Sequence, residues 1–188
     1  MKKLILISLV IFFAICSKSW SKTINSDDLI TRDGLIYERF TDIPFTGHVI
    51  GTGQGTIIKG KIEGVWREFN DNGQLHIISN LKHGKLEGES LEYYDSGQLY
   101  ERQNYKNDKL DGETIGYYKS GQLWFKKYYK ADNTEGEWLI YHENGALWKI
   151  QNYKNGKAEG KWLFYKKNGE LKKTEIRKNG RLIKTIEK

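Results

Sequence analysis

The sequence of 188 residues predicts an all-β protein, an elongated single-layer antiparallel meander built from 24-residue β-hairpin repeats. Two glycine series support this prediction, because each recurs five times at a constant spacing of 24 residues. The first series is Gly64, Gly88, Gly112, Gly136 and Gly160, and the second is Gly73, Gly97, Gly121, Gly145 and Gly169. A fixed period of this length is typical of stacked repeats, in which each unit contacts mainly its neighbours.

Each repeat has room for two short strands and two tight turns, and no helix fits between turns so closely spaced. One turn holds the second glycine after Asn or Ser, as in Asn72–Gly73, and the other lies between repeats, as in Asn155–Gly156. Asn-Gly between apolar runs is a strong hairpin signal, because both residues tolerate a positive φ. The single proline, Pro44, precedes the repeats and interrupts none of their strands.

Period-2 alternation predicts which side chains share a face of the sheet. In the first strand of a repeat, the positions of Leu91 and Tyr93 have one parity, and in the second strand the positions of Leu75 and Leu81 share a parity. We expect these positions to form one packed face. The opposite face is mixed and contains Trp66, Trp138 and Trp162, with Ser90 and Thr114 at the matching positions.

The repeat resembles the MORN repeat in its bacterial variant form, because a glycine is followed by an aromatic residue, a turn glycine and a leucine. The stretches GKLEGESLEYYDSGQLYERQNYKN and GKAEGKWLFYKKNGELKKTEIRKN carry the resemblance. Chains with runs of this repeat resemble the group named YwqK family antitoxins, and RDGLIYERFTDIPFTGHVIG is similar to the usual segment before such arrays. The resemblance covers Arg32 to Lys188 and implies a binding array, with a toxin protein as partner if the group name applies.

We expect four segments along the chain. These are a signal peptide at 1–21, an N-terminal cap with an irregular first repeat at 22–58, five MORN-like repeats at 59–178, and a C-terminal capping strand at 179–188. Two lysines precede the apolar run Leu4–Ile15, which is too short to span a membrane, and small residues precede a cleavage point before Lys22. The alternatives are an uncleaved anchor and lipidation of Cys16, which the bulky Ile15 disfavours.

Cleavage at this point implies export to the periplasm or the cell surface and leaves a mature chain without cysteine. Residues 1–21 hold three lysines and no acid, so the net charge falls from +7 to 7 − 3 = +4. This modest charge is interspersed along the chain, which argues against nucleic acid as a partner. Weak contact with anionic lipid or polysaccharide is compatible with it.

The residues predict no enzyme, no cofactor and no metal site. The four histidines share no repeat position and have no Cys or fixed carboxylate spacing beside them. The glycine-rich stretch Gly47–Thr56 lacks the Lys-Ser/Thr of a phosphate-binding loop, and no helix pattern follows it. No nucleophile-elbow motif is present.

Two charged rows follow the repeat. The acids are Glu63, Glu87, Asp111, Glu135 and Glu159, and the lysines are Lys82, Lys106, Lys130, Lys154 and Lys178. We expect the rows to run side by side and to form cross-strand charge pairs that support the register. The alternative is a carboxylate row that binds a cation or a basic partner.

The mixed face is the candidate partner-binding surface. Its candidate residues are Trp66, Tyr94, Tyr118, Trp124, Trp138, Trp148 and Trp162, with Tyr100 at the same parity. Aromatic side chains that a core does not need serve interfaces or sugar stacking. The alternative is that neighbouring side chains or residues 23–41 cover this face. The sequence therefore predicts a non-enzymatic exported scaffold that binds a protein or envelope component, with a neutraliser of a toxin protein as the alternative.

Overall fold

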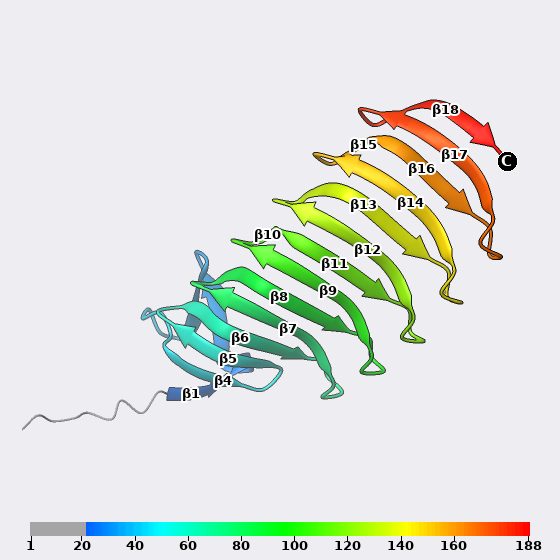
Figure 1. The fold of residues 1–188 in the computed structure, drawn as a ribbon. Helices are drawn as coiled ribbons and strands as arrows, with labels where there is room; N and C mark the ends of the chain where they lie inside the picture. Colours follow the sequence, from blue (N-terminus) through cyan, green and yellow to red (C-terminus); the bar gives the residue numbers. More distant parts are fainter. Residues whose placement is uncertain (1–21) are drawn as a thin grey trace, which may run out of the picture.

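The computed structural model describes residues 22–188, and the predicted signal peptide lies outside them. A 16-stranded sheet forms the body of the molecule, and a separate two-stranded hairpin lies near its N-terminal end. Figure 1 shows hairpins stacked one after another along a single axis, with the two ends of the sheet far apart. Residues 22–188 contain one 3-10 turn and no α-helix. The predicted elongated meander of hairpin repeats is therefore confirmed.

The N-terminal part consists of short strands. They are β1 (Lys22–Asn25), β2 (Leu29–Arg32), β3 (Leu35–Glu38), β4 (Gly47–Ile50) and β5 (Gly53–Ile58), with a 3-10 turn at Ser26–Asp28. β1 pairs with β4 in parallel, the one parallel pair in the described sheet, and β4 with β5 forms the irregular first hairpin. β2 and β3 form the separate hairpin.

Five units of two strands follow. They are β6 (Lys61–Phe69) with β7 (Leu75–Lys82); β8 (Lys85–Tyr93) with β9 (Leu99–Lys106); β10 (Lys109–Leu110) and β11 (Gly112–Tyr117) with β12 (Leu123–Lys130); β13 (Asn133–Tyr141) with β14 (Leu147–Lys154); and β15 (Lys157–Ala158) and β16 (Gly160–Tyr165) with β17 (Leu171–Lys178). The last strand is β18 (Arg181–Glu187), which pairs with β17. We refer to these hairpins as units one to five.

The N-terminal hairpin β2–β3 caps one face of the sheet at its first strands. The buried core there consists of Ile24, Phe45, Val49 and Ile57, and Leu29, Ile36, Ile62 and Trp66 pack against it. The amide of Ile36 donates to the carbonyl of Gly60 at 2.9 Å, which ties the hairpin to the sheet. Trp66, predicted to belong to a free binding surface, instead packs against this buried core, as Leu29 and Ile36 of the β2–β3 hairpin also do.

The turns between units, and not the turns inside a unit such as Asn72–Gly73, have two residues at positive φ. Asn107 and Asp108 have φ values of 50° and 66°, as a type I′ turn requires. At Asn72–Gly73 only the glycine has a positive φ, of 80°, and the Asn72 Oδ1 accepts from the amide of Gln74 at 2.9 Å. The Asn-Gly turns inside the units, at Asn72, Asn144 and Asn168, are thus longer loops closed by an Asx hydrogen bond.

Each unit contains a β-bulge in its second strand. In unit two Glu92 pairs with Glu101 and Tyr93 pairs with Leu99, so Tyr100 has no partner in the ladder. The equivalent residues in the five units are His76, Tyr100, Trp124, Trp148 and Lys172. An extra residue reverses the alternation beyond it. The prediction that Leu75 and Leu81 share a face is therefore wrong.

The pairing register defines two faces. What we call the aromatic face carries an outer row of Glu68, Ile77, Glu92, Glu101, Gly116, Phe125, Ile140, Lys149, Phe164 and Lys173. It also carries Trp66, Trp138 and Trp162 and the tyrosines Tyr105, Tyr129 and Tyr153. The aliphatic face carries a central row of Arg67, Ile78, Leu91, Arg102, Ile115, Lys126, Leu139, Ile150, Leu163 and Thr174.

The acidic row binds turn amides and not the lysine row. The acids accept from the backbone amides of His83, Asn107, Ala131, Asn155 and Asn179, at 2.7, 2.9, 3.2, 2.7 and 2.8 Å. No ion pair within residues 22–188 joins an acid of this row to a lysine of the other. The predicted charge pairs are therefore wrong, because the type I′ turn presents an amide that needs an acceptor.

Candidate binding surface

Aromatic rings form a continuous chain across the aromatic face of units three to five. Consecutive ring centroids in the chain Tyr118, Trp124, Phe125, Trp138, Tyr153 and Trp162 lie 5.7, 5.1, 6.4, 6.0 and 5.4 Å apart. These separations are those of interacting aromatic pairs. The bulge brings Trp124 beside Phe125, its neighbour in sequence, so that residues of opposite parity contribute to one surface.

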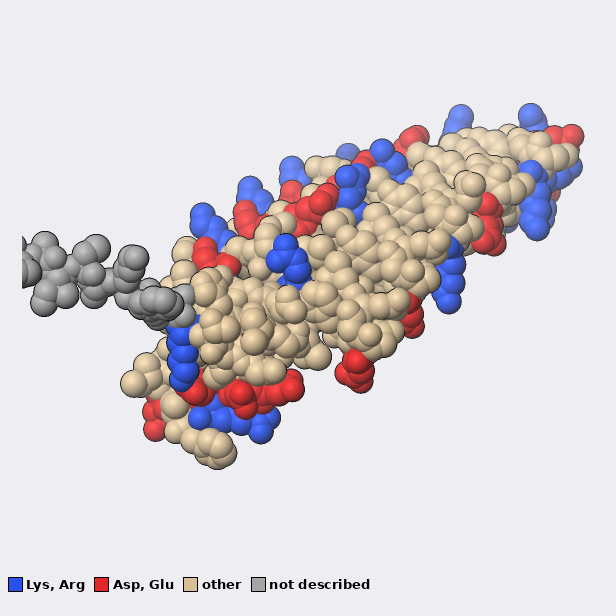
Figure 2. Space-filling model, turned by 90° about the horizontal axis from the view of Figure 1, so that it is seen from below, with Lys and Arg blue, Asp and Glu red and all other residues tan. Residues whose placement is uncertain are grey.

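Basic side chains lie on these rings. The Nζ of Lys127 lies 4.7, 5.0 and 5.4 Å from the ring centroids of Phe125, Tyr129 and Trp138. Lys149 Nζ is 3.7 Å from the centroid of the Trp148 ring. Each lysine thereby covers apolar surface with its stem and keeps its charge over a ring. The surface is both aromatic and cationic. Figure 2 shows one side of the molecule, where uncharged surface runs along the length and charges gather near the margins.

Replacing Lys127 with methionine tests the contribution of this cation. Methionine keeps the length and most of the packing of the stem, but it removes the charge from three rings. We expect Lys127→Met to lower the free energy of unfolding by about 1 kcal/mol. Urea unfolding followed by tryptophan fluorescence measures the change. Lys130→Met, at an exposed position of the lysine row, is the control, and an equal loss in both variants would contradict the contact.

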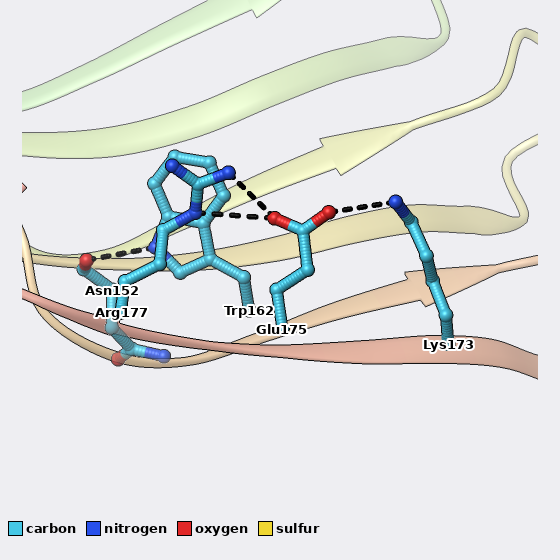
Figure 3. A network of polar contacts seen from close by, with 5 residues as sticks. All are labelled: Asn152, Trp162, Lys173, Glu175 and Arg177. Carbon is cyan, nitrogen blue, oxygen red and sulfur yellow. Dashed lines mark hydrogen bonds and ion pairs between the residues drawn. The ribbon is translucent and has the colours of Figure 1, made fainter. Parts of the chain in front are cut away.

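Unit five holds a buried carboxylate at the end of the aromatic chain (Figure 3). The Glu175 side chain is 8% exposed and accepts from Lys173 Nζ at 2.6 Å and from Arg177 Nη2 at 2.6 Å. Burial alone would raise the pKa of Glu175, but the hydrogen bonds and charges of Lys173 and Arg177 hold that pKa below its ordinary value. The Arg177 guanidinium lies 4.1 Å from the Trp162 ring centroid, and the Trp162 indole donates to the Asn152 carbonyl.

Aromatic pairs mark the bulges along one margin of the surface. Tyr94 packs edge-on against Tyr100 at 4.9 Å, and His142 stacks on Trp148 at 5.5 Å. The Tyr94 hydroxyl donates to the carbonyl of Tyr117 at 2.8 Å, and that of Tyr118 donates to the carbonyl of Tyr141 at 2.7 Å. Each of these hydroxyls therefore forms a hydrogen bond with the following unit. Burial raises the pKa of both tyrosines.

Tyr118→Phe removes one of these bonds between units and keeps the ring. We expect a loss of about 1 kcal/mol in the free energy of unfolding, because the Tyr141 carbonyl loses its tyrosine donor. The control is Tyr165→Phe, because the Tyr165 hydroxyl makes no contact among the described hydrogen bonds. Comparing the thermal unfolding midpoints of the two variants distinguishes the loss of this hydrogen bond from a general effect of losing a hydroxyl. Equal midpoints for the two variants would exclude a stabilising role for the bond.

A shallow pocket lies in the middle of this surface. Its volume is about 400 Å³, and it is lined by Tyr100, Glu101, Trp124, Phe125, Lys127, Trp138, Ile140 and Trp148. The lining is mainly aromatic, with one carboxylate and one ammonium group. Such a pocket fits an apolar or aromatic side chain of a partner better than it fits a charged group.

The structure brings together most of the predicted candidate residues. Tyr94, Tyr118, Trp124, Trp138, Trp148 and Trp162 lie on the aromatic face or at its margin, and Trp66 lies under the cap. Sequence reasoning missed Phe125 and Phe164, as well as the lysines that lie on the rings. The outer-row register identifies Phe125, Phe164 and Lys149, because it places them in one row with Ile140 and Lys173, and Lys127 lies in the adjacent row opposite Thr114.

Four segments of the chain match the family described as MORN repeat variant, at residues 62–83, 86–107, 110–131 and 134–155. The chain is a MORN-repeat protein. Unit five lies outside the matched segments, although β16 and β17 pair with the same register shift as the other units. No curated protein matches this MORN-repeat chain.

MORN repeats are commonly modules that bind proteins or membranes, and they are not known as enzymes. Within residues 22–188 of this MORN protein, no group of three or more His, Cys, Asp or Glu side chains could hold a metal ion. The same stretch has no helical segment with the length and hydropathy needed to span a lipid bilayer.

Proposed function

We propose that this MORN-repeat chain is a non-enzymatic scaffold, exported to the periplasm or cell surface, that binds a protein through the aromatic face of units three to five. The observation that carries the proposal is the continuous chain of rings from Tyr118 to Trp162. Within the described chain, the cap packs against the face only near Trp66. Aromatic residues on a rigid sheet are the residues most often found at the centre of protein interfaces.

The aliphatic face is the weaker candidate, because its charges neutralise one another. Arg102 lies 3.6 Å from a Glu89 oxygen and 3.2 Å from a Glu113 oxygen, both on neighbouring strands. On the aromatic face, Lys127 and Lys149 lie on rings and keep their charges available to a partner.

Trp148→Ala tests the choice of face. Trp148 is 38% exposed and lines the pocket. We therefore expect Trp148→Ala to lower the affinity for the partner at least tenfold, while the circular dichroism spectrum stays unchanged. Tyr128→Ala is the matched control, since Tyr128 is 47% exposed and pairs with Glu113 of the aliphatic face. Retention of the partner by the first variant and release by the second would place the interface on the other face.

Export is tested by the intact mass of the chain recovered from separate cell fractions. A species that begins at Lys22 in the periplasm or medium supports the exported scaffold and excludes a lipid anchor at Cys16. A full-length species in the cytoplasm contradicts export and favours the alternative, a YwqK-type neutraliser of a toxin protein. Co-expression with the products of neighbouring genes tests that alternative, because it requires rescue from a toxic neighbour.

A further inference from the structure

We propose that the C-terminal end of the sheet docks an acidic, extended polypeptide segment of a partner protein. This basic end consists of unit five and β18, residues 157–188. It contains 11 Lys and Arg residues and four acids, a net charge of 11 − 4 = +7, so residues 22–156 have a net charge of 4 − 7 = −3. The charge expected to be interspersed along the chain is therefore concentrated at one end of the array.

The basic end departs from the repeat in charge but not in fold. Lys172 occupies the bulge position, which holds a ring in the other four units. Lys161 occupies a repeat position that holds an acid in units two, three and four, namely Glu89, Glu113 and Glu137. β16 and β17 nevertheless pair with the same register shift as the strands of the other units. The fold therefore does not require these lysines.

Most cations of the basic end have no acidic partner. Eight of the 11 take part in no ion pair within residues 22–188, and all eight are exposed. These free cations are Lys157, Lys161, Lys167, Lys172, Lys178, Arg181, Lys184 and Lys188. Three of the four acids are already engaged, because Glu170 and Glu175 form ion pairs with the remaining cations and Glu159 accepts from a turn amide. The fourth, Glu187, lies opposite Lys173 in the ladder. The excess positive charge is therefore available to a partner.

The free cations surround the end of the sheet. One group flanks the turns between units and consists of Lys157, Lys178 and Arg181. A second group lies at the opposite margin and consists of Lys167, Lys172 and Lys188. The other two, Lys161 and Lys184, both lie opposite Ile176 on the aliphatic face, about 10 Å apart at the usual strand spacing. Figure 2 shows Lys and Arg side chains on opposite sides of the end of the molecule away from the grey residues.

This arrangement favours a flexible acidic chain over a flat anionic surface. The attraction of an anionic membrane falls off within a Debye length, so a bilayer reaches the cations of one side at a time. A chain of acidic side chains can instead follow the cations from one margin to the other. β17 has eight residues and spans about 26 Å between the margins, which is the length of about eight extended residues. The expected occupant is therefore a segment of about ten residues rich in Asp or Glu.

The rings of unit five argue against a ligand that binds by stacking. Single-stranded nucleic acids stack their bases on free aromatic side chains that lie beside cations. Here the Arg177 guanidinium lies 4.1 Å from the Trp162 ring centroid, and Lys173 Nζ lies 4.4 Å from that of Phe164. Both rings thus already carry a cation, and Glu175 pairs with both of these cations. The basic end therefore offers charged hydrogen-bond donors without a free stacking surface, which suits the carboxylates of a polypeptide.

This site goes beyond the proposed function, because it is separate from the aromatic pocket. The pocket is lined by residues of units two to four, from Tyr100 to Trp148, and none of the free cations lines it. Trp148→Ala, which tests the proposed function, is therefore expected to leave the affinity of the basic end unchanged. The failure of one proposal is thus distinguishable from the failure of the other.

A fluorescein-labelled peptide of ten glutamates is the probe, and its fluorescence anisotropy measures binding to the full chain at low salt. We expect saturable binding that weakens as salt is added, since exposed charges are screened. A quadruple variant removes four free cations and keeps the Glu175 contacts: Lys161→Gln, Lys172→Gln, Lys178→Gln and Lys184→Gln. We expect it to bind the peptide about tenfold more weakly, because each exposed charge pair contributes only modestly.

The matched control removes four exposed lysines beside turns of units one to three: Lys82→Gln, Lys85→Gln, Lys106→Gln and Lys109→Gln. It lowers the net charge by the same amount and is expected to bind the peptide as the unmodified chain does. Circular dichroism shows whether each variant is folded. No binding by the unmodified chain, or equal weakening in the two quadruple variants, would overturn the site. Binding of phosphatidylglycerol vesicles or of single-stranded DNA, without binding of the glutamate peptide, would overturn a polypeptide as the occupant.

Discussion

Gly116→Val is expected to lower the free energy of unfolding by about 3 kcal/mol, because no side chain fits at this position. A Cβ added to Gly116 would lie 2.2 Å from a carbon of the Phe125 ring, and Gly116 is buried in the middle of the sheet. The backbone cannot move away, since it pairs with Glu101 on one side and with Phe125 on the other. Urea unfolding followed by tryptophan fluorescence measures the loss.

Two comparisons isolate the clash with Phe125. Gly121→Asn is the control, because its Cβ would meet nothing within 4 Å and Asn tolerates its φ of 81°. We expect a change of less than about 1 kcal/mol there. The double variant Gly116→Ala with Phe125→Leu should lose less free energy of unfolding than the sum of the losses in the two single variants. Additive losses would show that the ring does not lie on the glycine.

Glu175→Gln is expected to lower the free energy of unfolding by about 2 kcal/mol at neutral pH. Glutamine keeps the shape of the side chain but leaves Lys173 and Arg177 without their carboxylate. The expected loss is smaller than for a fully buried pair, because the side chains of these two residues are 29% and 23% exposed. Glu170→Gln, at an exposed pair with Lys166, is the control and should change little.

The pH dependence follows from the same contact. The pKa of Glu175 is held below its ordinary value in the folded chain, so the unfolded chain binds the proton more readily. The stabilisation is therefore present above the ordinary pKa near 4.5 and is lost as the pH falls through the folded value. The difference between the unmodified chain and Glu175→Gln should shrink in acid. A difference that stays constant down to pH values well below the ordinary pKa would contradict the ion-pair account.

The sequence predicts the fold well, because the period and the turn residues are local features. It does not predict the bulge. The bulge residues His76, Tyr100, Trp124, Trp148 and Lys172 have no common chemistry, and only the pairing of the two strands shows that they are extra. One extra residue in the second strand of a unit was enough to assign Leu75 and Leu81 to the same face in error.

The binding surface is only partly predictable for a related reason. The tryptophans were visible as residues that the repeat does not require, but Phe125 and Phe164 occupy an outer row that holds Glu68 and Glu92 in other units. Because this row holds acidic, aromatic, aliphatic and basic residues in different units, no residue type that recurs with the repeat identifies the row in the sequence. The contact of Trp66 with the buried core of Ile24, Phe45, Val49 and Ile57 depends on tertiary packing before the repeats, which the periodicity does not describe.

Site-specific photocrosslinking tests the central claim, that the aromatic face is the binding face, most directly. A photoreactive phenylalanine analogue at position 148 reports on the aromatic face, and the same group at position 128 reports on the aliphatic face. We predict covalent adducts from position 148 in intact cells and none from position 128. Adducts from position 128 alone would contradict the account.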